Sequence, residues 1–448
     1  MNITYLYLSI YLLVIAYITL KSSRKESGSD YLNSSKKLSA WESTWTTFAS
    51  LLTGYNFVLG VTFAYLYGFW YLMAFVGAGL AFVVLYFVFK KRLTALQSKH
   101  DLFSVGDYFG IEYAISTKVF VNIILCVALF LFLTLQIFVN TGLFSALLSV
   151  SKLTALFLTT GVVCIYLWFG GFKTSVRTDI FQGILMLPII LTVLVFPFHF
   201  TLEKIPTAFD PSQLGFAIGL ALLQFLSLLA QAESFQRIFA SKDSLSLKKG
   251  LTGAFILLVL VAGSIAYLGI NFKFAGINID PSNLFTVGVL AALPHWLGSF
   301  LLVSLIAAFM GTIDSSAFAL GVLLTRTRNT LSSKAVKQTR YFTLFGIVVS
   351  ALASLYLFSF LSSVFALISL ISIIGTAFLI SLVFSKTDTM ETNTFLAVGT
   401  VIYISGLIFK FVTDNPLTSL IPSVGGFIAF LILKTYRKTI SPTISAQN

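Results

Sequence analysis

The chain has 448 residues, of which 57% are hydrophobic and only 10% are charged. Its mean hydropathy of +0.95 exceeds what a soluble core needs. The composition therefore excludes a soluble globular protein and predicts an all-α protein that crosses the membrane many times. The formal net charge of +13 does not indicate nucleic-acid binding, because the basic residues lie in short loops between apolar spans.

Apolar stretches that are long enough for a helical span, about 20 residues each, recur along the whole chain. We expect the first of them to be kept as a helix, since it lacks the basic leader and the cleavage site of a signal peptide. The stretches between spans are too short to hold a core, so we expect no separate soluble domain. We predict about 13 spans, at 3–21, 41–66, 69–89, 117–147, 153–169, 178–199, 212–239, 250–271, 295–325, 341–361, 363–385, 394–412 and 417–435.

Basic residues divide the loops between the two sides of the membrane. If the N-terminus lies outside, nearly all of the 29 lysines and arginines fall on the cytosolic side. This asymmetry predicts a multi-pass protein of the plasma (inner) membrane, with its N-terminus outside and its C-terminus in the cytosol. The exceptions are Lys152, Lys204, Lys273 and Lys410.

The span 41–66 has Thr53 and Gly54 near its middle, at a place where a helix can break. A break exposes backbone carbonyl and amide groups, which the membrane interior tolerates only where they face a cavity or an ion. The alternative interpretation is a continuous helix in which the glycine provides a packing notch.

Asp179 lies at the start of the predicted span 178–199, shortly after a pair of glycines at 170–171. A carboxylate near a helix N-terminus is electrostatically favourable, with Thr178 as the N-cap residue. The alternative is that Asp179 is a ligand for an ion.

The span 212–239 carries one polar cluster near its middle and one charged cluster near its cytosolic end. Gln224 and Ser227 form the first, and such side chains commonly make hydrogen bonds between helices. Glu233 and Arg237 are four residues apart, so we expect them to pair with each other on one helix face at the membrane interface.

The stretch from Ala307 to Ser316, with the sequence A-A-F-M-G-T-I-D-S-S, is polar inside an otherwise apolar run. A carboxylate and three hydroxyl groups at that depth are expensive to bury in lipid. Helical spacing puts Ala308, Gly311 and Thr312 on one face, and a hard cation takes oxygen ligands of this kind. The alternative is a close helix–helix contact through small residues.

Taken together, these motifs resemble the sodium:solute symporter family. The matching segments follow the order of the family between about Asp30 and Phe384. They are T-G-Y-N-F-V-L-G from Thr53, T-D-I-F-Q-G from Thr178, F-Q-R-I-F-A-S-K-D from Phe235 and A-A-F-M-G-T-I-D-S from Ala307.

The resemblance implies the inverted-repeat fold of LeuT-type transporters, with two repeats of five helices each. The repeats would be 41–199 and 212–385, and the first helix of each repeat (helices 1 and 6, spans 41–66 and 212–239) would be broken in the membrane. Residues 1–40 would then form an extra helix and a cytosolic loop. Residues 394–448 would form two C-terminal helices and a short cytosolic tail.

The resemblance also implies where cations bind. The sodium site that the family shares, built from helix 1 carbonyls and helix 8 oxygens, matches Ala49, Leu52, Ala308, Gly311 and Thr312. A second cation site, found in some members, matches Asp179, Gly311, Asp314 and Ser315.

Gly311 departs from the family pattern, because most members have a serine at this position. One hydroxyl ligand is therefore missing, and we expect weaker sodium binding or a different coupling ion. Two neighbouring carboxylates do not readily ionise together, so Asp179 and Asp314 could share a proton, which keeps proton coupling open.

The function implied is secondary active transport rather than an enzymatic reaction: sodium-coupled symport of a small polar solute into the cell by alternating access. The alternatives are a proton-coupled symporter of the same fold and a transporter-like substrate sensor. We expect sodium as the bound ion, the lipid bilayer as the surroundings, no nucleic acid and no obligate protein partner. The residues expected to bind the solute are Thr53, Asn56, Gln136, Gln224 and Ser227.

Overall fold

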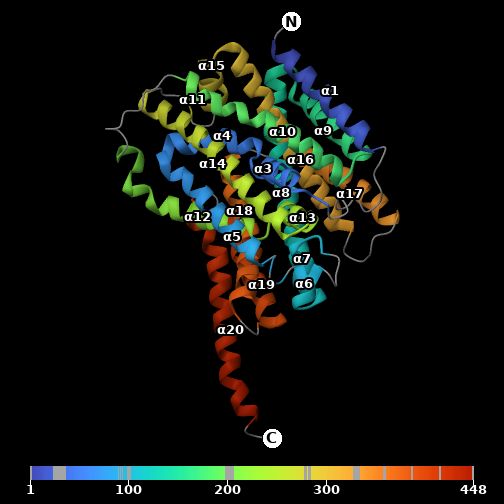
Figure 1. The fold of residues 1–448 in the computed structure, drawn as a ribbon. Coiled ribbons are helices and arrows are strands. Elements are labelled where there is room, and N and C mark those ends of the chain that lie inside the picture. The colour runs from blue at the N-terminus through green and yellow to red at the C-terminus, as the bar shows by residue number, and fades with distance from the viewer. Residues whose placement is uncertain are drawn as a thin grey trace.

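The fold is known from a computed structural model (Figure 1). It describes residues 3–23, 37–88, 90, 92, 94–97, 102–196, 206–276, 280, 284–325, 333–356, 360–384, 387–412 and 415–445. Within these ranges the chain is almost entirely helical, and the β-structure is limited to one isolated bridge between Leu38 and Ser241. The predicted all-α class is confirmed.

The first half of the chain holds the helices expected up to residue 199, some of them divided, and two short helices, α6 and α7, between the expected spans. They are α1 (Ile3–Ser23), α3 (Ala40–Leu51), α4 (Gly54–Tyr67), α5 (Met73–Val88), α6 (Thr94–Gln97), α7 (Val105–Glu112), α8 (Ile115–Leu148), α9 (Lys152–Phe169), α10 (Phe172–Met186) and α11 (Thr192–Val195). Two 3-10 turns, η2 (Gly68–Leu72) and η4 (Leu187–Leu191), connect neighbouring helices.

The second half continues in the same way. Its α-helices are α12 (Leu214–Leu228), α13 (Ala232–Ala240), α14 (Ser244–Phe274), α15 (Leu290–Ala292), α16 (His295–Thr325), α17 (Ser333–Ser354), α18 (Phe360–Val383), α19 (Thr389–Ile408) and α20 (Ile421–Ser445). The short turns are η6 (Pro206–Phe209), η7 (Pro211–Gln213), the π-helical η9 (Leu284–Val289) and η10 (Thr418–Leu420).

Eleven helices of the described chain are long and apolar enough to cross a membrane. Two differences separate this number from the thirteen spans expected. The stretch Gly54–Val88 counts once although it contains both α4 and α5, and α17, which begins with several basic residues, is not among the eleven. The protein is therefore multi-pass, and the number thirteen stays a prediction.

Two of the expected spans are interrupted. α3 ends at Leu51, and Leu52 (ψ 79°) and Thr53 (ψ 160°) leave the helical conformation before α4 begins. α12 ends at Leu228, and after a short turn Gln231 (ψ 122°) is extended before α13 begins. Each interruption leaves backbone groups of the helix ends without their usual helical partners.

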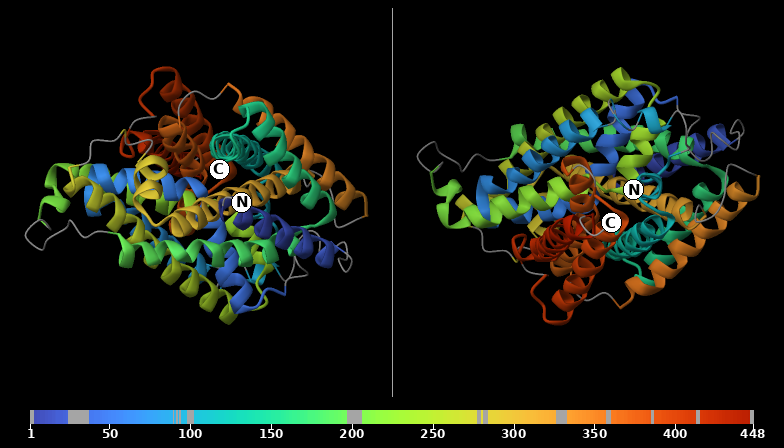
Figure 2. Two further views of the ribbon diagram at one scale, coloured as in Figure 1. Left: turned by 90° about the horizontal axis from the view of Figure 1, so that it is seen from above. Right: turned by 90° about the horizontal axis from the view of Figure 1, so that it is seen from below.

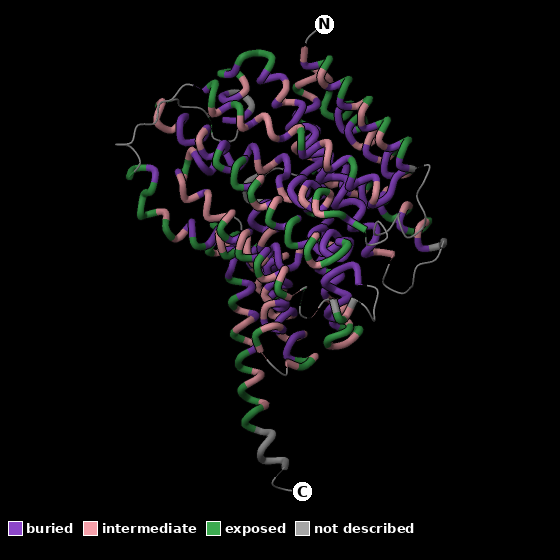
Figure 3. The backbone as a smooth tube through the Cα atoms, in the orientation of Figure 1, coloured by how far each residue is buried: buried purple, intermediate pink, exposed green. Residues whose placement is uncertain are grey.

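α16 forms the centre of the molecule. It packs against α1, α3, α8, α9, α10, α13 and α17, and 83% of its apolar stretch is buried, compared with 28% for α1. Buried residues fill the middle of the molecule and exposed residues lie around it (Figure 3). In the two end views (Figure 2), the red helices α19 and α20 gather at one edge, away from α3 and α14.

Several boundaries differ from the predictions, among them the start of α10 and the end of α20. α10 begins at Phe172, with Gly171 as its N-cap residue, so Asp179 lies inside the helix and Thr178 is not a cap. The pair of glycines ends α9 and starts α10 directly, which leaves no loop up to residue 177. The C-terminal helix α20 also continues to Ser445, beyond the expected end at 435.

Candidate cation and solute sites

The first expected cation site lies where the interruption between α3 and α4 meets α16. Gly54 packs directly on the ring of Phe309, because a Cβ atom at this position would lie 2.3 Å from the ring. Only glycine permits this approach. The contact holds the interruption against α16 within one helical turn of Thr312.

Carbonyl oxygens at the end of α3 remain available. Among the described residues, no hydrogen bond reaches the carbonyl oxygen of Ala49 or Leu52, whereas Leu51 O accepts one of 2.7 Å from Asn56 Nδ2. The last carbonyls of a helix have no intrahelical donor. Both unpaired oxygens belong to residues that the family resemblance assigns to the sodium site.

Thr312 carries the hydroxyl that is expected at this site. Its Oγ1 lies 3.0 Å from Ala308 O and 3.1 Å from Gln136 Oε1. The hydroxyl has one proton to donate and keeps lone pairs that can face a cation. Gln136, which was expected at the solute site, is instead fully buried beside Thr312.

Gly311 faces α10. A Cβ atom at Gly311 would lie 2.4 Å from Gln182 Oε1, so the side-chain amide of Gln182 fills the space beside Gly311. One residue further along α10, a Cβ atom at Gly183 would be 3.6 Å from Cβ of Ala49. Thus α3, α10 and α16 meet at this point.

The second expected cation site contains an arginine. Nη2 of Arg237, on α13, lies 2.8 Å from Asp179 Oδ2 and 2.9 Å from Ser315 Oγ. Its Nε donates to Thr46 Oγ1 at 2.9 Å, and Thr46 in turn donates to Asp179 Oδ2 at 2.5 Å. The guanidinium therefore already bonds to two of the residues that were expected to hold a cation.

Asp314 has its own set of donors. Tyr166, on α9, donates to Oδ2 at 3.0 Å, and Ser315 and Ser175 donate to Oδ1 at 3.1 and 3.3 Å. No hydrogen bond joins Asp314 to Asp179 among the described side chains. The geometry therefore does not show the shared proton that the sequence left open.

The prediction that the side chains of Glu233 and Arg237 pair with each other is wrong. Arg237 Nη1 donates to the backbone oxygen of Glu233 at 3.0 Å, while the Glu233 carboxylate accepts a bond of 2.7 Å from Ser316. Both side chains are only 3% exposed, so they lie inside the protein rather than at an interface. The spacing of Glu233 and Arg237 along the chain could not indicate that other helices, α16 and α10, supply their side-chain partners.

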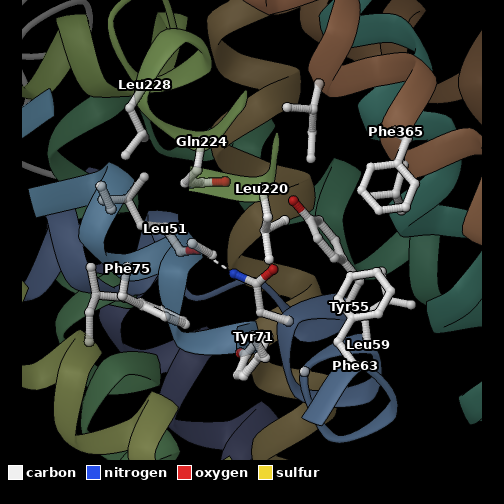
Figure 4. Close-up of a pocket in the computed structure, with 17 residues that line it drawn as sticks. Leu51, Tyr55, Leu59, Phe63, Tyr71, Phe75, Leu220, Gln224, Leu228 and Phe365 are labelled. Atoms are coloured by element: carbon white, nitrogen blue, oxygen red, sulfur yellow. Dashed lines mark hydrogen bonds between the residues drawn. The ribbon is translucent and has the colours of Figure 1, made fainter. Parts of the chain in front are cut away.

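Two adjoining cavities of about 70 and 60 Å³ lie between the interrupted helices (Figure 4). They share the lining residues Leu51, Tyr55, Asn56, Gln224 and Ile368. Both Asn56 and Gln224 were expected to bind the solute. The remaining expected residues Thr53 and Ser227 line the second cavity, and Gln136 lines neither.

Glu233 also lines the second cavity. Around the first cavity the walls are largely apolar and aromatic, with Tyr71, Phe75, Phe63 and Phe365 near Gln224 and Tyr55 (Figure 4). Such a cavity, mostly apolar with a few polar groups, is typical of a small-molecule site.

The sequence did not indicate four residues of this region as site residues: Thr46, Tyr166, Gln182 and Arg237. Arg237 and Gln182 lie within the family motifs quoted above, so the motifs could have indicated both residues. Tyr166 and Thr46 lie in runs without a distinctive pattern, and only the packing of α9 and α3 against α16 brings them to the carboxylates.

The oxygen atoms expected at the first site are of a type that suits a sodium ion. They are neutral backbone and hydroxyl oxygens from Ala49, Leu52 and Thr312, which are the donor type that a hard cation takes. The second site fits an additional cation less well, since the guanidinium of Arg237 already supplies a positive charge to Asp179.

Comparisons with known proteins give the family. The model of the sodium:solute symporter family matches residues 31–387. The osmoregulated proline transporter OpuE of Bacillus subtilis (strain 168) is 27% identical over 252 residues, which cover 51% of each chain. The chain thus aligns with about half the length of this relative.

Two further relatives align over longer stretches. The sodium/pantothenate symporter of Haemophilus influenzae is 23% identical, covering 78% of this chain and 76% of the relative. The sodium/proline symporter of Staphylococcus aureus (strain Newman) is 25% identical, covering 72% and 67%.

The fold is also that of a solved transporter structure. The substrate-bound outward-open state of a Na+-coupled sialic acid symporter superposes with a TM-score of 0.79, covering 96% of both chains at 16% identity. The match of the family model over most of the chain, together with the order of its motifs, shows that the chain belongs to the sodium:solute symporter family.

Proposed function

We propose that the protein is a secondary active transporter, which couples the entry of a small polar solute to sodium by alternating access. The observation that carries this proposal is the shared position of two features at the α3–α4 interruption. Leu52 carries one of the unpaired carbonyl oxygens, and its neighbours Leu51 and Thr53 line the second cavity. A cation that holds this interruption in shape would also shape the solute site.

One sodium ion supports substantial accumulation. A monovalent cation that moves through about 100 mV releases roughly 2.3 kcal/mol, equivalent to about fiftyfold accumulation of one solute. The concentration gradient of sodium adds to this. We propose sodium rather than a proton as the coupling ion, because Asp179 and Asp314 accept hydrogen bonds from separate donors and not from each other.

The proposed stoichiometry is one sodium ion per solute. Arg237 supplies the positive charge beside Asp179 that a second sodium ion would supply elsewhere. An additional cation beside Asp179 would lie next to the guanidinium of Arg237, and two like charges close together are unfavourable in a region shielded from water. The charge moved per solute, measured as a reversal potential, tests this proposal.

The proposed solute is small and donates hydrogen bonds. The side chains of Thr53, Asn56, Gln224, Ser227 and Glu233 offer oxygen atoms along the cavities. Glu233 is the one charged side chain among the described residues that line these two cavities, and its carboxylate favours a solute with an ammonium, amide or hydroxyl group.

We propose the plasma (inner) membrane as the location, with the N-terminus outside and the C-terminus in the cytosol. The distribution of basic residues supports this orientation. The start of α1 and the end of α20 lie at opposite ends of the molecule (Figure 1), which supports this orientation. We propose the same repeats as the sequence suggested, 41–199 and 212–385, flanked by 1–40 and 394–448.

A thermal-shift screen of purified protein against small solutes, with sodium and with choline in its place, tests the proposal. A bound ligand raises the unfolding temperature by mass action. We expect one solute class to stabilise the protein more strongly when sodium is present. Stabilisation that is independent of sodium for every solute would contradict sodium coupling.

A further inference from the structure

Gln182 is a fully buried amide on α10 with only one of its two ends paired. Its Nε2 donates to the hydroxyl of Tyr11 on α1 at 3.0 Å, and that hydroxyl lies 3.6 Å from Met310 Sδ. Its Oε1 has no hydrogen-bond partner within the described structure, although Gln182 is only 1% exposed. An unpaired buried carbonyl oxygen is unfavourable unless another group satisfies it.

This unpaired oxygen points at Gly311. A Cβ atom at Gly311 would lie 2.4 Å from Oε1, compared with 3.6 Å from Nε2. The oxygen therefore lies where the side chain of residue 311 would begin. Most members of the family have a serine at this position, and its hydroxyl is the ligand that this chain lacks.

The same point of α10 also touches the opposite side of the first cation site. Gly183 follows Gln182 and packs on α3, since a Cβ atom at Gly183 would lie 3.6 Å from Cβ of Ala49. Ala49 provides one of the unpaired carbonyl oxygens. Gln182 thus lies at the junction of both helices that contribute ligands.

We infer that Gln182 Oε1 is an oxygen ligand of the sodium site and replaces the hydroxyl that Gly311 lacks. This inference rests on the proposed sodium coupling. Glycine at position 311 lets the amide oxygen of Gln182 lie close to the α16 backbone, while Nε2 is bonded to Tyr11 on α1. An amide oxygen is a ligand that hard cations accept, so the site keeps its number of oxygen donors.

A matched pair of substitutions at Gly311 tests the inference without altering Gln182. Gly311→Ala would push Oε1 aside without supplying a new oxygen, whereas Gly311→Ser would push it aside and supply a hydroxyl. The readout is equilibrium binding of radiolabelled sodium to the purified full-length protein, measured by scintillation proximity. We expect Gly311→Ala to weaken sodium binding roughly tenfold or more, and Gly311→Ser to bind within about twofold of the original protein.

Substitutions of Gln182 provide the second arm. Gln182→Leu should weaken sodium binding by a similar factor, and the double variant Gln182→Leu with Gly311→Ser should regain it. Tyr11→Phe is the control for packing around the amide, because it removes the bond to Nε2 while the residue that carries Oε1 is kept. We expect sodium binding of Tyr11→Phe to stay within about twofold of the original protein.

Each outcome decides one question. Equal sodium binding by Gly311→Ala and Gly311→Ser, or by Gln182→Leu and the original protein, would overturn the role of Gln182. An effect of Tyr11→Phe as large as that of Gln182→Leu would reduce Gln182 to a packing role and overturn it as well. Absence of sodium binding by the original protein would instead contradict the proposed function.

Discussion

Arg237 donates from Nη2 to Asp179 Oδ2 over 2.8 Å, and both side chains are almost completely buried. The pair connects α13, which follows the second interruption, to α10. Through Thr46, which accepts from Arg237 and donates to Asp179, it also includes α3, which precedes the first interruption. One charged cluster therefore holds both interrupted helices in register with the rest of the protein.

Breaking this pair from one side should destabilise the protein. Asp179→Asn leaves the buried guanidinium without its carboxylate, and we expect a loss of about 3–5 kcal/mol of folding free energy. Thermal unfolding of the purified protein measures this loss. Asp210→Asn, at an exposed loop carboxylate, is the control and should unfold close to the original temperature.

The Asp179→Asn variant also tests the proposed stoichiometry of one sodium ion per solute. If the guanidinium occupies the second cation site, the charge moved per solute should be unchanged in any Asp179→Asn protein that still transports. A ratio that falls by one charge would show that Asp179 binds a second sodium ion.

Removal of the Thr312 hydroxyl should weaken sodium coupling. Thr312→Ala deletes a donor atom of the first site, and we expect the sodium concentration for half-maximal uptake to rise about tenfold. Thr312→Ser keeps the hydroxyl and should retain most of the affinity. Identical sodium dependence of the alanine and serine variants would remove Thr312 from the site.

The close approach of Gly54 to Phe309 should be sensitive to a single methyl group. Gly54→Ala would place Cβ 2.3 Å from the ring, and overpacking of this kind costs about 1–3 kcal/mol. Gly161→Ala, in α9, is the matched control because nothing lies within 4 Å of its Cβ position. It should be neutral or slightly stabilising. Equal unfolding temperatures for the two variants would contradict the contact.

Gln224 should affect solute binding without affecting sodium binding. Gln224→Leu keeps the volume of a residue that lines both cavities but removes its polar groups. We expect the KM for the solute found by screening to rise about tenfold, equivalent to the loss of one good hydrogen bond. Sodium binding in the absence of solute serves as the internal control, and a parallel loss there would argue for a structural role.

Hydropathy and the order of motifs were sufficient to predict the helical, multi-pass fold and the family. Long apolar runs have few alternatives in a membrane, because every backbone group must be paired within the chain. The unpaired carbonyls of Ala49 and Leu52 follow from an interrupted helix, whereas their assignment to a cation site comes from the family resemblance and stays a prediction.

The polar partners were not predictable, because they depend on which helices pack together. Arg237 is four residues from Glu233 in sequence but bonds to an aspartate 58 residues away. Gln136 was expected at the solute and lies beside Thr312. The glycine at position 311 suggested a cation site that lacks one oxygen ligand. In the structure, the side chain of Gln182 occupies the space beside Gly311.

Uptake of the identified solute into proteoliposomes under an imposed sodium gradient tests the central claim most directly. The proposed mechanism predicts that an inward sodium gradient alone drives accumulation above equilibrium. It also predicts that Thr312→Ala shifts the required sodium concentration upward. Accumulation that is driven by a proton gradient in the complete absence of sodium would contradict it.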